Sequence, residues 1–113
     1  MTDSNMTDKI LVFTTAGSNE EARRIADALV ERRQAGCVNI IKGVESIYRW
    51  KGKTEESQEW MLLIKTTAAA FDNVSKTIRE LHSYELPECI GVSITQGTPA
   101  CMRWIDESVE RKS

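Results

Sequence analysis

At its centre the chain carries Ser46-Ile47-Tyr48-Arg49-Trp50-Lys51-Gly52-Lys53, followed by Glu59-Trp60-Met61-Leu62-Leu63-Ile64-Lys65-Thr66. Both runs are rich in β-branched, aromatic and leucine residues, which favour strands. A Lys-Gly-Lys segment between them predicts a reversal of the chain. Because Val38 and Ile40 extend the first run toward the N-terminus, the sequence predicts one long β-hairpin over residues 37–66.

Upstream of this hairpin the sequence predicts a strand and then a helix. Ile10-Leu11-Val12-Phe13 is a continuous apolar run, typical of a strand that is buried on both faces. Ser18 with Glu21 matches a capping box, and Gly36 is placed as a residue that ends a helix. The apolar residues between them recur at helical spacing: Ala22, Ile25, Ala26, Leu29 and Val30.

Downstream of the hairpin the sequence predicts a helix, a strand and a last helix. Pro87 separates the second helix from a strand at about residues 89–95, and Thr98 followed by Pro99 is a favourable start for the third helix. The positions expected to face the core are Phe71, Val74, Ile78 and Leu81 in the second helix and Met102, Ile105 and Val109 in the third.

The order of these elements is β-α-β-β-α-β with an additional C-terminal helix. It predicts a ferredoxin-like α+β fold with an antiparallel sheet, helices on one face and a long hairpin between the second and third strands. Residues 1–8 are polar and are expected to form a flexible segment, and residues 9–113 a single domain. Because this fold hosts many unrelated functions, it does not by itself indicate an activity.

Composition excludes several classes of partner. Fifteen Lys and Arg against seventeen Asp and Glu give a net charge of −2, without the basic surface that nucleic-acid binding needs. No run approaches the ~20 apolar residues of a membrane span, and the N-terminus lacks a signal pattern, so we expect a cytoplasmic protein. The three cysteines, Cys37, Cys89 and Cys101, are expected to be reduced, since an odd number without C-x-x-C spacing fits neither a disulfide framework nor a zinc site.

The common activities of this fold lack their signatures here. Residues 59–66 carry one aromatic residue and no RNP-like motif, which disfavours RNA recognition. Residues 14–18 contain neither a thiol pair for a soft metal nor an arginine for a phosphate. A hydrolase that uses Cys37 or Cys89 with His82 remains a minor possibility, because no sequence signature supports it.

Four motifs occur in order along the chain: residues 35–41, Ser46–Lys53, Ile64–Thr66 and His82–Glu88. Together they resemble the CutA family of divalent-cation tolerance proteins, with similarity extending over residues 10–105. The resemblance implies a ferredoxin-like subunit of a homotrimer, distantly similar to PII signalling proteins. It also implies a cytoplasmic location and an association with copper and other divalent metals.

The same resemblance implies a metal site, but this chain has only one of the three ligand residues found in some relatives. Some bacterial relatives have a cysteine at the end of the first strand and two adjacent histidines before the Tyr-Glu motif. This chain has Thr14, Leu81 and His82 at those positions. His82 is thus the candidate metal ligand, completed by Glu85 or by a second copy, and it would bind Cu²⁺ more strongly than other divalent ions but only weakly. No obligatory cofactor is expected.

A second candidate site is a cleft or interface formed by Trp50, Glu59, Lys65, Tyr84 and Glu85. The four polar residues either converge in a pocket between subunits or form a solvated set of ion pairs. Tyr48, Trp50 and Trp60 either line a small-ligand cleft or, as we favour, pack across an interface.

The motifs and the candidate sites lead to two hypotheses for the function. The leading one is a non-enzymatic homotrimer that binds divalent metal in cation tolerance. The alternative is a PII-like signalling or scaffold trimer that binds a small anionic metabolite in an intersubunit cleft.

The expected length of the hairpin also favours assembly. Strands of ~10 residues span about 33 Å, whereas a 15-residue helix covers only about 22 Å. The hairpin should therefore extend beyond its own helices and expose Tyr48, Trp50 and open sheet edges. We expect a homo-oligomer in which hairpins pair between subunits.

Overall fold

The computed structural model describes residues 7–110. Of the N-terminal segment expected to be flexible, residues 1–6 lie outside the described part. Thr7 donates a hydrogen bond to the carbonyl oxygen of Ile94, and the Asp8 carbonyl accepts one from Ala68. The elements are β1 (Lys9–Ala16), α1 (Asn19–Glu31), β2 (Cys37–Trp50), β3 (Lys53–Thr67), a 3₁₀ turn (Ala68–Ala70), α2 (Phe71–Leu81), β4 (Ile90–Ser93) and α3 (Pro99–Ser108).

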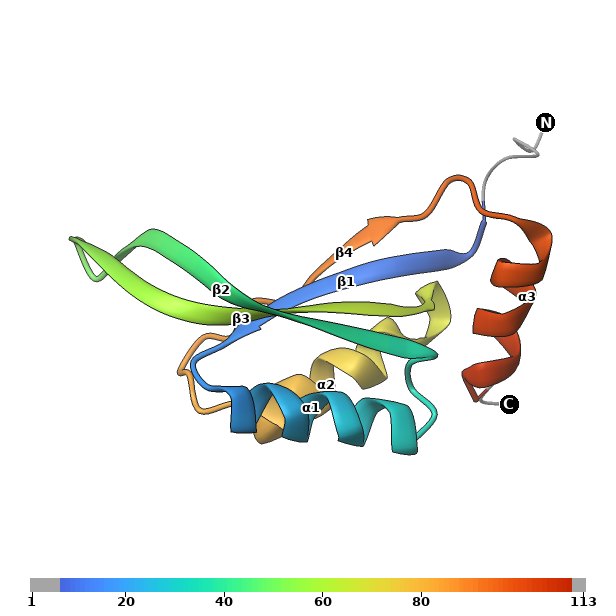
Figure 1. The fold of residues 1–113 in the computed structure, drawn as a ribbon, viewed down its shortest axis with the longest axis horizontal. Coiled ribbons are helices and arrows are strands. Elements are labelled where there is room, and N and C mark those ends of the chain that lie inside the picture. The colour runs from blue at the N-terminus through green and yellow to red at the C-terminus, as the bar shows by residue number, and fades with distance from the viewer. Residues whose placement is uncertain (1–6, 111–113) are drawn as a thin grey trace.

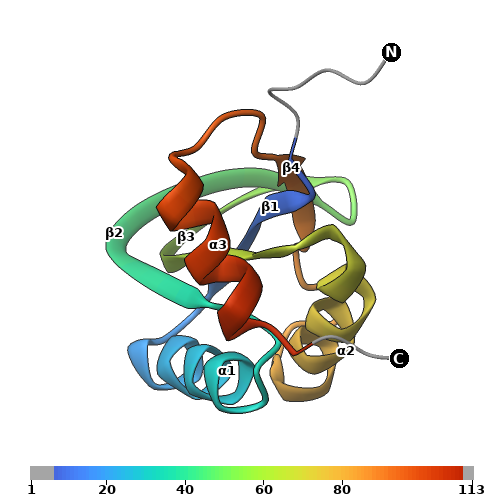
Figure 2. The same ribbon diagram turned by 90° about the vertical axis from the view of Figure 1, so that its right-hand side faces the viewer.

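The four strands form one antiparallel sheet in the order β2-β3-β1-β4. Helices α1 and α2 lie side by side on one face of this sheet (Figure 1). Helix α3 packs at the end of the sheet that is remote from the hairpin turn (Figure 1), the end that Figure 2 views directly. The predicted ferredoxin-like fold is therefore confirmed. Over residues 7–110, no helix has the length and apolar character needed to cross a membrane.

The core lies between the sheet and the two helices. Alternation along β3 turns Leu62 and Ile64 toward the helices, where both are fully buried, and turns Met61, Leu63 and Lys65 to the other face. The same core cluster contains Val12, Ile25, Leu29, Val74 and Ile78.

Within residues 7–110 of one chain, no helix or strand covers the second face of the sheet. Leu11 and Phe13 on β1 are only partly buried there, so the expectation that residues 10–13 are buried on both faces is wrong for the single chain. Ile90 and Val92 of β4 lie opposite Phe13 and Leu11 and are about half exposed. These residues, with Leu63 of β3, form what we call the open sheet face.

Two further expectations need correction. Val30 follows the helical spacing of the apolar residues of α1 but lies 44% exposed, because the stripe that contacts the sheet ends at Leu29. The last strand is shorter than expected and begins after Cys89.

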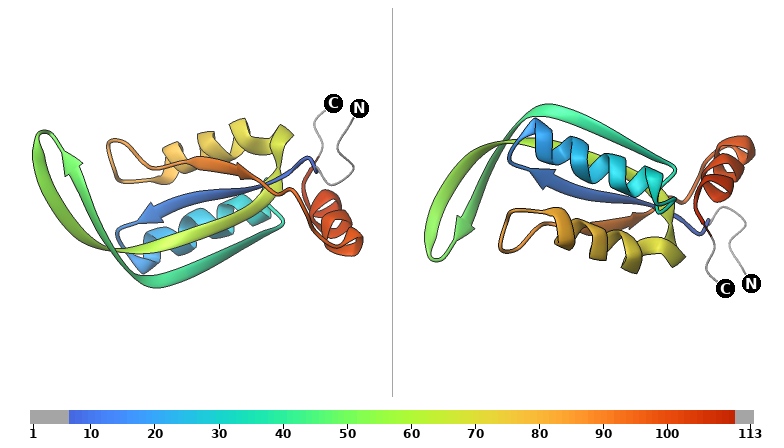
Figure 3. Two further views of the ribbon diagram at one scale, coloured as in Figure 1. Left: turned by 90° about the horizontal axis from the view of Figure 1, so that it is seen from above. Right: turned by 90° about the horizontal axis from the view of Figure 1, so that it is seen from below.

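The predicted hairpin is present. Its turn has positive φ at both Lys51 and Gly52, as a two-residue type I′ turn requires. Lys42 and Gly43 together lie opposite Trp60 alone, which forms a β-bulge with Gly43 at φ 80°. Beyond this bulge the hairpin curves and extends past both helices (Figure 3). The molecule consequently measures 46 × 30 × 24 Å.

Candidate functional site

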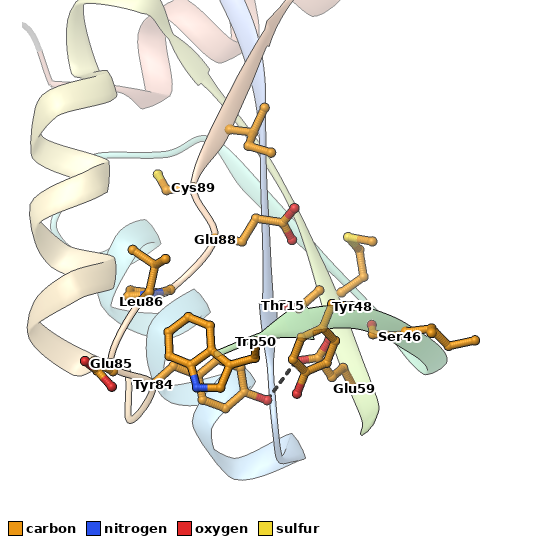
Figure 4. A pocket seen from close by; sticks show the side chains of 14 residues that line it. Thr15, Ser46, Tyr48, Trp50, Glu59, Tyr84, Glu85, Leu86, Glu88 and Cys89 are labelled. Carbon is orange, nitrogen blue, oxygen red and sulfur yellow. Dashed lines mark hydrogen bonds between the residues drawn. The ribbon is translucent and has the colours of Figure 1, made fainter. Parts of the chain in front are cut away.

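An open pocket of about 850 Å³ lies where the protruding hairpin faces the segment between α2 and β4 (Figure 4). The hairpin and the segment after α2 supply most of the wall, so the pocket exists because the hairpin is longer than the helices. Its aromatic residues are Tyr48, Trp50 and Tyr84, its carboxylates are Glu59, Glu85 and Glu88, and its apolar residues include Met61, Leu86 and Ile90.

The most buried polar residue in the pocket lining is Glu59. Glu59 is only 5% exposed, and its Oε2 accepts a 2.7 Å hydrogen bond from the Tyr84 hydroxyl. Burial, the hydrogen bond to Glu59 and the charge of Glu59 raise the pKa of the Tyr84 phenol above its usual range. The phenol therefore stays neutral and remains a hydrogen-bond donor.

His82 fixes the start of the segment between α2 and β4 through hydrogen bonds. Its side chain is fully buried, and its Nε2 lies 2.6 Å from the carbonyl oxygen of Thr15. Its Nδ1 accepts a 3.1 Å hydrogen bond from the backbone N–H of Tyr84. These partners require a neutral ring with the proton on Nε2. The lone pair of Nδ1 is already used, so the arrangement does not fit the expected role of His82 as a metal ligand.

Glu21 is a site residue that the sequence analysis treated only as part of a helix cap. The Ser18 hydroxyl does accept a hydrogen bond from the Glu21 N–H, as predicted. The Glu21 carboxylate, however, accepts a 2.8 Å hydrogen bond from the backbone N–H of Ser83 and lies 3.6 Å from His82 Nδ1. Glu21 and His82 together fix the backbone from which Tyr84 enters the pocket. The only sequence signal was an acidic residue on the buried side of an amphipathic helix.

The pocket brings together four of the five cleft candidates: Trp50, Glu59, Tyr84 and Glu85. Lys65 does not join them in one chain. It lies six residues from Glu59, about 20 Å along β3, between Leu11 and Cys37 on the neighbouring strands.

The aromatic residues of the hairpin do not share one environment. Trp60 packs against the core, whereas Tyr48 and Trp50 line the pocket. The alternation of β3, which turns residue 60 to the helix side and residue 59 to the pocket side, explains the difference.

The lining of the pocket carries negative charge. Among residues 7–110, three carboxylates and no basic side chain line it. At its rim, Lys51 Nζ lies 3.7 Å from Glu85 Oε1 and 5.7 Å from the centre of the Trp50 ring. An ammonium group of the chain itself thus lies near both a carboxylate and an aromatic ring.

The described residues give little support for a metal site or for a cysteine nucleophile. Among residues 7–110 no group of three or more His, Cys, Asp or Glu side chains is arranged to hold a metal ion. Burial raises the pKa of the Cys89 thiol despite opposing effects of Ser75 and Arg79, which disfavours its thiolate. Cys37 pairs with Lys65, whereas His82 contacts Thr15, which pairs with Met61 further along β3. The arrangement gives no support to a Cys–His nucleophile.

Comparison with known proteins identifies the family. Residues 10–108 match the family described as CutA1 divalent ion tolerance protein. The divalent-cation tolerance protein CutA of Thermus thermophilus is 45% identical over 98 residues, which cover 87% of this chain and 95% of that protein. Protein CutA of Mus musculus is 39% identical over 101 residues, which cover 89% of this chain but only 57% of the mouse protein.

Solved structures agree with this assignment. The crystal structure of CutA from Xylella fastidiosa has a TM-score of 0.89 at 38% identity and covers 92% of this chain and 100% of that one. The structure of the Thermus thermophilus protein has a TM-score of 0.89 at 43% identity, with coverage of 90% and 99%. The chain therefore belongs to the CutA1 divalent ion tolerance family.

Proposed function

We propose that this chain forms a cytoplasmic homotrimer that acts in divalent-cation tolerance by binding cations, and that it has no catalytic role. The observation that carries this proposal is the charge of the pocket: among residues 7–110 it is lined by Glu59, Glu85 and Glu88 and by no basic side chain, and Lys51 pairs with Glu85 only at the rim. Such a lining concentrates cations and repels anions. Membership of the CutA1 family supports the connection to divalent ions.

Assembly is supported by the surfaces that one chain leaves open. Ile90 and Val92 of the open sheet face are 51% and 49% exposed, and β2 is a long edge strand. Soluble proteins cover apolar faces and long strand edges of this kind. The number three comes from the resemblance to the family, in which a second copy would cover this face.

Copper is the divalent ion that we expect to bind most strongly, on the general order of affinities for nitrogen and oxygen ligands. Since both nitrogens of His82 are engaged, the carboxylates of the pocket that solvent reaches are those of Glu85, which also pairs with Lys51 at 3.7 Å, and Glu88. Two carboxylates form a weak site unless another copy adds ligands. Binding should therefore be modest and should not depend on His82.

A calorimetric copper titration tests this proposal. The double variant Glu85→Gln/Glu88→Gln should bind Cu²⁺ at least about threefold more weakly than the wild type. The control Glu31→Gln/Glu107→Gln removes the same charge from exposed positions of α1 and α3 and should leave affinity unchanged. Equal loss in both double variants would show that only net charge matters and would overturn a pocket site.

The PII-like alternative, in which an anionic metabolite binds in an intersubunit cleft, has less support. An anion entering this pocket would meet three carboxylates and no lining basic group.

A further inference from the structure

We propose that helix α3 is a conformational device: it detaches from the end of the sheet and rejoins it as a unit, and Arg33 is the residue that holds it in place. Arg33 lies in the loop of residues 32–36 between α1 and β2. Figure 2 shows α3 crossing the end of the sheet. The inference is independent of the proposed function, because it concerns contacts within one chain and involves no cation.

The apolar attachment of α3 is small. Of the ten residues of α3 only Ile105 is buried, and Val109 is buried directly after the helix. By comparison, α1 buries five of its residues and α2 buries three. A segment with few buried apolar contacts opens at a lower free energy than the rest of a fold. The hydrophobic core therefore contributes less to holding α3 than to holding either of the other helices.

Arg33 has a backbone conformation that is unfavourable for arginine. Its φ is 58°, in the left-handed region, where glycine is the usual residue at the end of a helix. Its N–H donates to the Val30 carbonyl at 3.0 Å, and the next N–H, of Gln34, donates to the Leu29 carbonyl at 2.9 Å. These two bonds end α1 and need no arginine side chain. An arginine at a position that favours glycine points to a separate role for its side chain.

The side chain of Arg33 binds the C-terminal end of α3. Its Nη2 donates a 2.6 Å hydrogen bond to the Glu107 carbonyl, and its Nε donates a 3.3 Å bond to the Ser108 carbonyl. The Arg33 carbonyl in turn accepts a 2.8 Å bond from the N–H of Glu110. The last carbonyls of a helix lack partners within the helix and carry partial negative charge, which a guanidinium satisfies. Both side-chain bonds lie at the exposed surface, so water replaces them when α3 detaches.

Gly36 allows α3 to approach this loop closely. The sequence predicts that Gly36 ends α1, but α1 already ends at Glu31, and the left-handed residue that follows it is Arg33. A Cβ atom at Gly36 would lie 3.4 Å from Ser108 Cβ and 3.6 Å from Ile105 Cα. Even the smallest side chain would thus touch α3, and a larger one would displace it. The loop therefore holds α3 by close contact at Gly36 and by hydrogen bonds from Arg33.

Lys9 of β1 makes a second polar contact with α3. Its side chain is 8% exposed, and its Nζ lies 3.4 Å from Asp106 Oδ1. Lys9 also pairs with Asp8 of its own strand end. Because the Asp8 carboxylate stays beside the Lys9 ammonium when α3 leaves, detachment does not produce an unpaired buried charge.

Hydrogen–deuterium exchange of the full-length protein, in the oligomeric state that it adopts and read by mass spectrometry, tests the detachment. Peptides that cover residues 102–109 should exchange at least about tenfold faster than peptides that cover α1 and α2. Low concentrations of urea should leave their rates nearly unchanged, because a local opening exposes little surface. Protection of α3 equal to that of α1 and α2 would overturn the inference.

Two variants of Arg33 test the attachment. Arg33→Gly removes the guanidinium and favours the left-handed backbone, whereas Arg33→Ala removes the guanidinium and keeps the unfavourable backbone. Exchange of α3 should become about tenfold faster in both variants. Wild-type exchange of α3 in Arg33→Gly, which relieves the backbone and so keeps the fold, would overturn the role of the Arg33 side chain.

Arg32→Ala is the matched control. The neighbouring Arg32 carries the same charge but contacts α2, with its Nη1 3.2 Å from Thr77 Oγ1 and 3.1 Å from Glu80 Oε1. Its replacement should leave the exchange of α3 unchanged. Equally fast exchange of α3 in Arg32→Ala and in the Arg33 variants would overturn the assignment of Arg33, because loss of any positive charge in the loop would then suffice.

Discussion

The hydroxyl of Tyr84 donates a 2.7 Å hydrogen bond to Glu59 Oε2, which joins the segment after α2 to the middle of β3. This contact links two walls of the pocket. The Tyr84 N–H donates to His82 Nδ1, and Glu59 lies on β3, which pairs with β2. This one bond therefore contributes both to stability and to the shape of the pocket.

Replacing Tyr84 with Phe should lower the free energy of unfolding by about 1–2 kcal/mol, since it leaves a buried carboxylate without its donor. Chemical denaturation measures this change. Tyr48→Phe is the matched control, because Tyr48 lines the same pocket and is similarly exposed, 44% against 36% for Tyr84, but Tyr84 is the residue that donates to Glu59; it should cost less than about 0.5 kcal/mol. Equal costs in the two variants would show that the Tyr84 hydroxyl contributes nothing specific.

The raised pKa of Tyr84 predicts behaviour in alkali. A group whose pKa is raised on folding stabilises the fold fully below its unfolded pKa, about 10 for tyrosine, and loses this contribution as pH rises through the folded value. The Tyr84 contribution should thus persist at neutral pH and fade only in strong alkali. The difference in tyrosinate absorbance between wild type and Tyr84→Phe should titrate above about pH 10. A midpoint at or below that pH would contradict the prediction.

The fold could be predicted from the sequence because its signals are local. The apolar, strand-favouring residues of 59–66, the Lys51-Gly52 turn and the Ser18 and Thr98 caps each lie within a few residues of what they specify. The open sheet face could not be predicted in this way. In the sequence, Val92 cannot be told apart from a valine that is fully buried. The structure of a single chain shows the difference, because Val92 is 49% exposed.

The site was predictable only in part, because its contacts join distant segments. His82 and Thr15 are 67 residues apart, and Ser83 and Glu21 are 62 apart. A lone histidine in the sequence does not show that a carbonyl and an N–H occupy its two nitrogens. Lys65 illustrates the converse: its residue type suits a polar pocket, but its position on β3 keeps it from Glu59 within one chain.

Replacing His82 with Ala tests its structural role. The change removes the partners of the Thr15 carbonyl and the Tyr84 N–H and leaves a cavity, so unfolding free energy should fall by about 2–4 kcal/mol. Copper affinity, measured by calorimetry below the melting temperature, should remain that of the wild type. A copper affinity reduced tenfold with unchanged stability would restore His82 as a metal ligand.

Cysteine reactivity provides an independent check of the pocket. The raised pKa of the Cys89 thiol leaves little thiolate at neutral pH, whereas Cys101 is exposed on α3. Alkylation at pH 7.5, followed by mass spectrometry of the peptides, should label Cys101 well before Cys89. Labelling of Cys89 first would show an activated thiol and revive the Cys–His possibility.

The open sheet face predicts where assembly can be broken. Light scattering of the wild type should give three times the 12.8-kDa mass of the chain. Val92→Glu places a charge on the face that a second copy would cover, so it should shift the protein to monomer and lower its melting temperature. Val30→Glu is the matched control, because Val30 is exposed to a similar extent, 44% against 49%, but lies on α1, away from this face. That variant should keep the trimer mass and nearly the wild-type melting temperature. If Val92→Glu also kept the trimer mass, the open sheet face would not be the contact between copies, and the hairpin and the β2 edge would be the surfaces to alter next.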